Sequence, residues 1–204
     1  MDQIRIKQFW NWFIDNEYQF REVTDTKTVI ELLNNQVLSF GLFAWELAVG
    51  TKKPHSFTIS PNGDKRRLQL SKEIMSQAPE LRQWEFHHCK KLKKDWDYTF
   101  EMFDRTMLKQ TYDAAKWEFV LVEEAGEKIS ILLYAPNIAT IDLDDLPAVG
   151  NMVVINLLGE EVKTNHVHSI QFIDDFLPED EKWIFDLPDL RIEFRAFLKE
   201  IQEY

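Results

Sequence analysis

Two carboxylates and two histidines are the residues of this chain whose types and surroundings could support acid–base chemistry. Glu46 lies in the apolar run from Phe43 to Val49, and Glu118 lies in a second apolar run. A carboxyl group buried among apolar side chains has a raised pKa, as a general acid requires. His87 and His168 complete this set of candidates for a small-molecule or enzyme pocket. A solvated strand carboxylate is the simpler interpretation of both glutamates, so no catalytic residue is assigned.

The tripeptide His87-His88-Cys89 contains residue types that bind transition metals. Adjacent strand residues point to opposite faces, so His87 and Cys89 would share a face without His88. The chain has neither a CxxC nor an HxxxH spacing to complete a metal site, and it has no GxGxxG, P-loop or GxSxG motif. We therefore predict no metal and no cofactor, and the sequence does not decide whether the chain is an enzyme.

Aromatic residues interrupt an acidic segment that runs from Asp174 to Asp186. Aromatic anchors ringed by charge are typical of protein interfaces. The preferred hypothesis is a non-catalytic protein-interaction module whose acidic face binds a basic protein partner. The predicted interaction residues are Asp174, Asp175, Phe176, Trp183 and Phe185.

Two further charged segments have both a functional and a structural interpretation. Lys90, Lys91, Lys93 and Lys94, followed by Trp96, resemble a small phosphate-binding patch, although a solvated linker is the simpler interpretation. The acids of Gly159-Glu160-Glu161 follow an expected helix, where they would oppose the helix dipole. This unfavourable position indicates that another group of the protein or of a partner holds the two glutamates.

Composition and charge limit the class of protein. The chain has 204 residues and a net charge of −11. Its single cysteine, Cys89, cannot form an intramolecular disulfide, and a protein without disulfides is typical of the cytoplasm. Binding to nucleic acid or an anionic membrane surface needs positive charge, so neither is expected. The apolar runs are too short to cross a bilayer. A homodimer joined through an edge strand is a further alternative.

Hydrophobic periodicity predicts the elements. Residues 66–77 favour a helix, although a hairpin at Asn62-Gly63 would instead make Arg66 to Leu70 a strand. Residues 90–94 are expected to form a linker. The other expected helices are 3–21, 25–40, 143–158 and 187–204, and the expected strands are 42–49, 55–60, 84–89, 98–103, 117–123, 128–134 and 166–173.

The order strand, strand, helix, strand occurs twice, in residues 42–89 and 117–173. We predict an α+β fold in which two ββαβ units form a mainly antiparallel sheet with helices on one face. The chain is treated as one domain, 1–204: an N-terminal helical pair (1–40), the two units (41–90 and 97–175) and a C-terminal helix (187–204). In this prediction a continuous sheet encloses a single interior that holds Phe43, Trp45, Phe119 and Ile131.

Several short motifs resemble a group of bacterial proteins without an assigned activity. They are Ile59-Ser-Pro-Asn-Gly63, Ala78-Pro-Glu-Leu81, Trp84-Glu-Phe86 and Leu158-Gly159-Glu160, and the resemblance spans residues 40–175. It implies a cytoplasmic bacterial α+β protein and brings no catalytic residues with it. Where that group often has an acid before Leu-Gly-Glu, this chain has Ile155 and Asn156.

Overall fold

The computed structural model describes residues 3–21, 26–104, 106–177 and 183–203. Its contacts divide the chain into two compact units, Met1–Lys90 and Lys91–Tyr204. The first unit contains 12 Lys/Arg and 11 Asp/Glu, whereas the second contains 12 Lys/Arg and 24 Asp/Glu. The first unit therefore has a net charge of +1 and the second a net charge of −12, so the net negative charge of the chain comes from the second unit. This division does not test the single-domain prediction, and each unit is described by itself.

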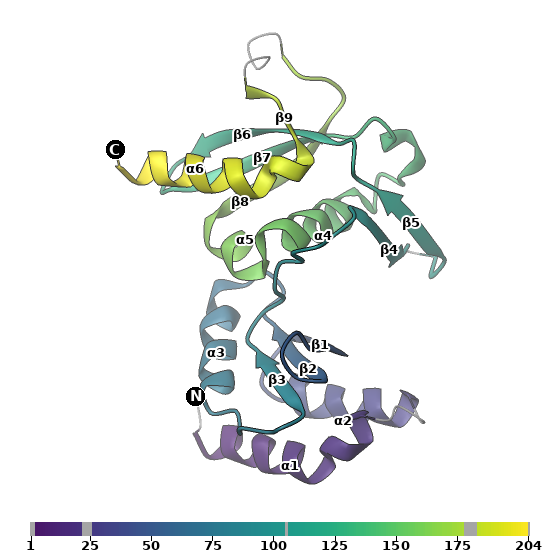
Figure 1. The fold of residues 1–204 in the computed structure, drawn as a ribbon, viewed down its shortest axis with the longest axis vertical. Helices are drawn as coiled ribbons and strands as arrows, with labels where there is room; N and C mark the ends of the chain where they lie inside the picture. The colour runs from purple at the N-terminus through teal and green to yellow at the C-terminus, as the bar shows by residue number, and fades with distance from the viewer. Residues whose placement is uncertain (1–2, 22–25, 105, 178–182, 204) are drawn as a thin grey trace. The chain divides into compact units, whose positions relative to one another are not determined.

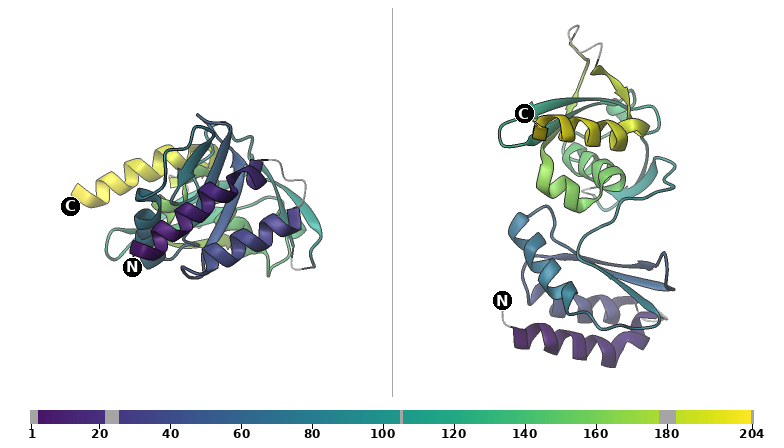
Figure 2. Two further views of the ribbon diagram at one scale, coloured as in Figure 1. Left: turned by 90° about the horizontal axis from the view of Figure 1, so that it is seen from below. Right: turned by 60° about the vertical axis from the view of Figure 1, so that its left-hand side comes forward.

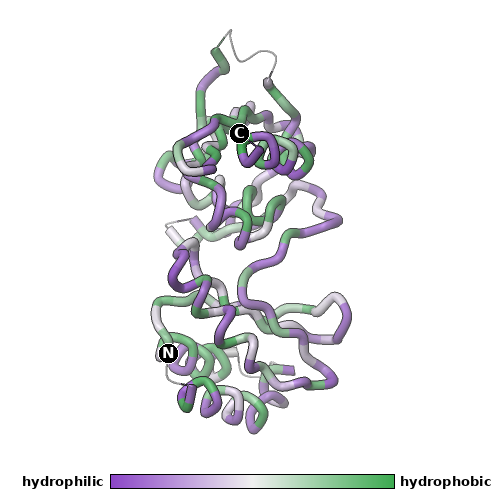
Figure 3. The backbone as a smooth tube through the Cα atoms, turned by 90° about the vertical axis from the view of Figure 1, so that its left-hand side faces the viewer, coloured by the Kyte–Doolittle hydropathy of each residue, from purple (hydrophilic) through white to green (hydrophobic). Residues whose placement is uncertain are grey.

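Two amphipathic helices open the first unit: α1 (Gln3–Arg21) and α2 (Thr26–Leu38) (Figure 1). Hydrophilic and hydrophobic residues mix along both (Figure 3). A helix with apolar residues three or four positions apart buries one stripe, and α1 does so with Ile6, Phe9, Trp10, Phe13 and Phe20. The helix predicted over residues 3–21 is confirmed.

The first sheet contains β1 (Ala44–Val49), β2 (His55–Ser60) and β3 (Trp84–His87) in that order. β1 and β2 are antiparallel, and β3 runs parallel to β2 after the crossover helix α3 (Lys65–Ser76). Asp64 caps α3, because its side chain accepts a hydrogen bond from Arg67 N at 2.8 Å. The helix predicted over residues 66–77 is therefore confirmed, with its last residue at Ser76, and the hairpin alternative is wrong. Figure 2 shows α1 and α2 together along one face of this sheet.

The second unit repeats the same connectivity. β6 (Glu118–Glu124) and β7 (Lys128–Tyr134) form an antiparallel hairpin, and β8 (Val167–Ile173) returns parallel to β7 after α4 (Leu146–Leu158) and α5 (Glu160–His166). The sheet order is β8-β7-β6-β9, where β9 is Phe185–Asp186. The mainly antiparallel α+β fold with two ββαβ units is confirmed.

Short elements complete the second unit. β4 (Thr99–Phe103) and β5 (Lys109–Asp113) pair as a separate hairpin, of which only the first strand was expected. The short helix η1 (Ile138–Thr140) precedes α4. Another, η3 (Leu187–Asp189), leads into the C-terminal helix α6 (Leu190–Glu203).

The expectation of one continuous sheet around a single interior is wrong. Phe43 and Trp45 belong to a core with α1 and α2, whereas Phe119 and Ile131 belong to a separate core with α4 and α6. Over the described residues, the strands form a three-stranded, a two-stranded and a four-stranded sheet. The order of strands along the chain does not show whether two ββαβ units share one sheet. Each unit here buries its own apolar face, so two separate sheets are formed.

The acids after Gly159 have a local explanation that the sequence interpretation missed. Gly159 has a φ of 84°, which favours glycine, and it ends α4 and begins α5. Glu160 and Glu161 lie in the first turn of α5, where the helix dipole favours negative charge. The predicted opposition to the dipole is therefore wrong. In the part of the chain that the structure describes, no helix has the length and apolarity that a membrane span needs.

Candidate functional site

A groove of about 530 Å³ lies between β6 and α6 in the second unit. We call it the acidic groove, because the charged residues that line it within the described ranges are all glutamates. The rest of the lining is apolar or aromatic. The lining residues are Val120, Leu121, Val122, Glu123, Trp183, Phe185, Glu193, Ala196, Phe197 and Glu200.

The acidic groove follows a strand edge that the described residues leave open. β9 pairs with β6 only at Glu118 and Phe119, although β6 continues to Glu124. Beyond Phe119, alternate residues of β6 direct their N–H and C=O groups toward the side of β9. Residues 120–123 line the groove at this edge. Open strand edges are templates for pairing with another chain.

Two aromatic residues form the wall of the groove that belongs to the β9 segment. The ring of Phe185 stacks on the buried ring of Phe119, with centroids 5.6 Å apart. Trp183 is 62% exposed. The stacked ring fixes the position of Phe185, and Trp183 offers a large apolar surface that a partner could cover.

The opposite wall is one side of α6. Glu193, Phe197 and Glu200 are spaced by four and three residues, which places them on the same side of a helix. Leu190 and Phe194 of the same helix are fully buried in the core with Phe119. Because this buried face of α6 is packed in the core, Glu193 and Glu200 on its flank are held beside β6. The amphipathic spacing of α6 is visible in the sequence, but its position beside Trp183 follows from tertiary packing.

The structure divides the predicted interaction residues into two places. Trp183 and Phe185 line the acidic groove. Asp174 and Asp175 are exposed after β8, which is the strand at the other end of the sheet from β9. Phe176 packs on Tyr134, with ring centroids 5.7 Å apart. Residues 178–182 of the predicted acidic segment lie outside the described residues.

Two of the four candidate acid–base residues occupy one row of the first sheet. Glu46 pairs with Thr58 across β1 and β2, and Thr58 pairs with His87 across β2 and β3. Glu46 is exposed and His87 is half-buried. The carboxylate near His87 is that of Glu85, with Oε2 3.4 Å from Nε2. Neither Glu46 nor His87 lines the acidic groove.

Glu118 and His168 are not brought together in the second sheet. Glu118 pairs with Tyr134, which pairs with Ile173 at the end of β8. His168 lies near the start of β8, five residues earlier, which is roughly 16 Å along a strand. A pocket that unites the four candidates is therefore not formed within either unit, and their catalytic role stays an untested prediction.

Glu85 accepts several hydrogen bonds that the sequence did not predict. Burial alone raises the pKa of its carboxyl group, but hydrogen bonds from the backbone N–H groups of Lys52 and Lys53 and from Thr51 lower this pKa to about 2. The Lys53 N–H lies 2.6 Å from Oε1. Glu85 thus holds the loop between β1 and β2 as a carboxylate.

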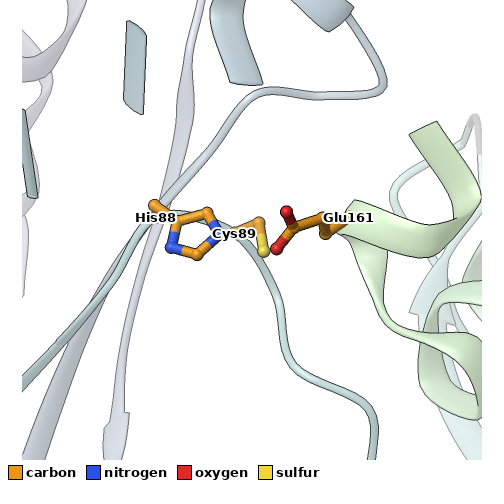
Figure 4. Close-up of side chains that lie close together, drawn as sticks. All are labelled: His88, Cys89 and Glu161. Carbon is orange, nitrogen blue, oxygen red and sulfur yellow. The ribbon is translucent and has the colours of Figure 1, made fainter. Parts of the chain in front are cut away.

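Figure 4 labels three side chains of metal-binding type: His88 and Cys89, which follow β3, and Glu161 of α5. The first two belong to one unit and the third to the other. Within either unit taken alone, the described residues contain no group of three such ligands with donor atoms within 4.8 Å of one another. These residues therefore carry no metal assignment, and the expected absence of a metal stays a prediction.

Comparisons of the chain with protein-family models, with curated protein sequences and with solved structures find no match.

Proposed function

We propose that this chain is a non-catalytic protein-interaction module whose acidic groove binds an extended, basic segment of a partner protein. The partner segment adds a strand to β6 beyond Phe119. The observation that supports the proposal is the coincidence of a strand edge that the described residues leave open with a groove whose described charged lining residues are three glutamates. Strand addition supplies affinity through backbone hydrogen bonds, and pockets for alternate side chains supply specificity.

The charge of the groove selects the chemistry of the partner. Glu123, Glu193 and Glu200 surround the strand edge, so lysine or arginine side chains on an added strand meet opposite charge. The apolar side chains on the other face of the added strand lie beside Val120 and Val122 of β6, which also line the groove. Successive residues of a strand point to opposite faces, and a segment that alternates basic and apolar residues therefore fits.

The test is a calorimetric titration of the full chain with a synthetic eight-residue peptide that alternates lysine and valine. A peptide with glutamate in place of lysine is the control ligand. We expect the lysine peptide to bind, the glutamate peptide not to bind, and the affinity to fall as salt rises from 50 to 300 mM, because exposed charges are screened.

Two variants locate the binding surface. Trp183→Ala removes the exposed aromatic residue and should weaken binding about tenfold, as is typical of an interface anchor. The double variant Glu193→Gln and Glu200→Gln should weaken it by a similar factor. Glu203→Gln is the matched control, because Glu203 lies on the same helix, pairs with Lys199 and does not line the groove.

Three outcomes would overturn the proposal. The first is no binding of the lysine peptide at 50 mM salt, and the second is equal binding of both peptides. The third is self-association of the chain, measured by analytical ultracentrifugation and abolished by Trp183→Ala, because a second copy would then occupy the groove.

A further inference from the structure

The second unit contains another pocket, whose charge is opposite to that of the acidic groove. It has a volume of about 570 Å³ and lies between the segment 93–98 and α6. We call it the basic pocket, because four of the nine described residues that line it are lysines or arginines and none of the nine is acidic. The lining residues are Lys93, Lys94, Trp96, Tyr98, Leu157, Pro188, Arg191, Ile192 and Arg195.

This concentration of positive charge is unusual for its surroundings. The unit carries 24 Asp/Glu against 12 Lys/Arg, and a third of those cations line one pocket. Asp95, Asp97 and Asp189 are close in sequence but do not line it. Ion pairs elsewhere in the unit join Lys109 to Glu101 and Lys199 to Glu203. Within the described ranges, no ion pair involves the four cations of the basic pocket.

The positions of the two arginines on α6 are electrostatically unfavourable for the helix. Arg191 and Arg195 are one helical turn apart on α6, and like charges at this spacing repel. Arg191 also lies in the first turn of the helix, where the dipole disfavours positive charge. A bound anion would relieve both effects.

Hydrogen bonds hold the aromatic wall of the basic pocket in place. Lys93 N donates to Asn156 O of α4 at 2.8 Å, which ties the segment to that helix. Trp96 Nε1 donates to Thr99 O at 2.9 Å, and the rings of Trp96 and Tyr98 have centroids 5.4 Å apart.

The backbone of Tyr98 has a φ of 65°, a conformation that is rare for a bulky residue. Ala114 N donates to Tyr98 O at 3.0 Å across the hairpin of β4 and β5 and holds this conformation. The two rings are therefore positioned before any ligand arrives.

We propose that the basic pocket binds a nucleoside phosphate. Arg191 and Arg195, with Lys93 and Lys94, contact the phosphate groups, and guanidinium groups match phosphate oxygens in a bidentate manner. The planar base packs on the rings of Trp96 and Tyr98. The volume of the pocket lies within the range of small-molecule sites, whereas a lone phosphate would leave most of it empty.

The test is isothermal titration calorimetry of the full chain at 50 mM salt with ADP, inorganic pyrophosphate and adenosine. We expect ADP to bind most tightly, pyrophosphate at least tenfold more weakly, and adenosine to show no binding below 1 mM. The double variant Arg191→Gln and Arg195→Gln should weaken both ADP and pyrophosphate at least tenfold, because each arginine supplies charge-assisted hydrogen bonds.

A second variant separates the base from the phosphates. Trp96→Leu should weaken ADP binding at least fivefold and leave pyrophosphate binding unchanged, because stacking on the base is lost while the cations remain. Lys199→Gln is the matched control on α6, since Lys199 does not line the pocket, and it should bind all three ligands as the wild type does.

The proposal is overturned if ADP does not bind below 1 mM, or if the arginine variant binds ADP as tightly as the wild type. Equal affinity for pyrophosphate and ADP, or binding of a phosphoserine peptide without ADP, also overturns it. Circular dichroism of each variant confirms that the fold is intact. Since the basic pocket and the acidic groove share no lining residue, failure here leaves the groove proposal standing and the reverse also holds.

Discussion

Arg191 and Glu193 are separated by one residue on α6, and their side chains line two different pockets of opposite charge. Arg191 lines the basic pocket beside Trp96, and Glu193 lines the acidic groove beside β6. Because successive helical residues are rotated by about 100°, these two positions lie on opposite flanks of the buried face that holds Leu190 and Phe194. One helix therefore separates the charges of the two proposed sites.

Charge reversal on one flank of α6 should affect only one site. In the variant Glu193→Lys and Glu200→Lys, the lysine–valine peptide should bind at least tenfold more weakly, because attraction becomes repulsion. ADP affinity should stay within twofold of the wild type. Calorimetric titration of both ligands measures the two effects on the same preparation. An equal loss of both ligands would contradict separate sites.

The stability of the first unit should depend on the charge of Glu85. Its folded pKa of about 2 lies below its ordinary value of 4.5, so the stabilisation is present above pH 4.5 and is lost as the pH falls toward 2. Glu85→Gln should lower the free energy of unfolding by about 2 kcal/mol at pH 7 and flatten this acid transition. Urea unfolding at several pH values measures it, with the exposed Glu46→Gln as the control. An unchanged acid transition in Glu85→Gln would refute this role.

Gly50 is required in the loop that Glu85 holds. A Cβ atom at this position would lie 2.3 Å from Lys53 O and 2.9 Å from His55 O, both of which are backbone atoms. Gly50→Ala should therefore destabilise the chain by about 2 kcal/mol or more, since the loop must move. Gly126→Ala is the comparison, because a Cβ there meets nothing within 4 Å and only the positive φ opposes it. Thermal unfolding in which Gly126→Ala is the more destabilising of the two would contradict the loop geometry.

The indole of Trp84 joins α1 to the first sheet. It is 1% exposed, and its Nε1 donates to Glu17 Oε2 at 2.5 Å. Trp84→Phe should lower the free energy of unfolding by about 2 kcal/mol, because a charge-assisted hydrogen bond and part of the buried ring are lost. Trp183→Phe is the exposed control and should change stability by less than about 0.5 kcal/mol. Equal urea midpoints for the two variants would exclude this role for Trp84.

The spacing of apolar residues was sufficient to predict the helices and strands in which that spacing is regular. The spacing of Ile6, Phe9, Phe13 and Phe20 predicted α1, and alternation predicted β2 over residues 55–60 with the bounds that are observed. β5 was missed, because Lys109–Asp113 buries a single side chain, Tyr112, and is otherwise polar. α5 was missed because its seven residues are mostly polar and carry no apolar stripe.

The candidate sites were predicted only in part, because their walls come from distant segments. Trp183 and Lys93 were singled out from local composition, and each lines a pocket. The partners that α6 supplies, Glu200 and Arg195, follow from tertiary packing of that helix against β6 and α4, which no local pattern encodes. Glu46 was selected for its apolar neighbours, but alternation along β1 leaves its side chain exposed.

Amide hydrogen exchange along β6 tests strand addition most directly, with the full chain measured free and saturated with the lysine–valine peptide. A partner strand supplies hydrogen bonds to alternate residues of the open edge. The account predicts that alternate amides between Val120 and Glu124 become at least tenfold more slowly exchanging when the peptide is bound, while amides in β1 and β2 do not change. Unchanged exchange across Val120 to Glu124 under saturating peptide would contradict the account.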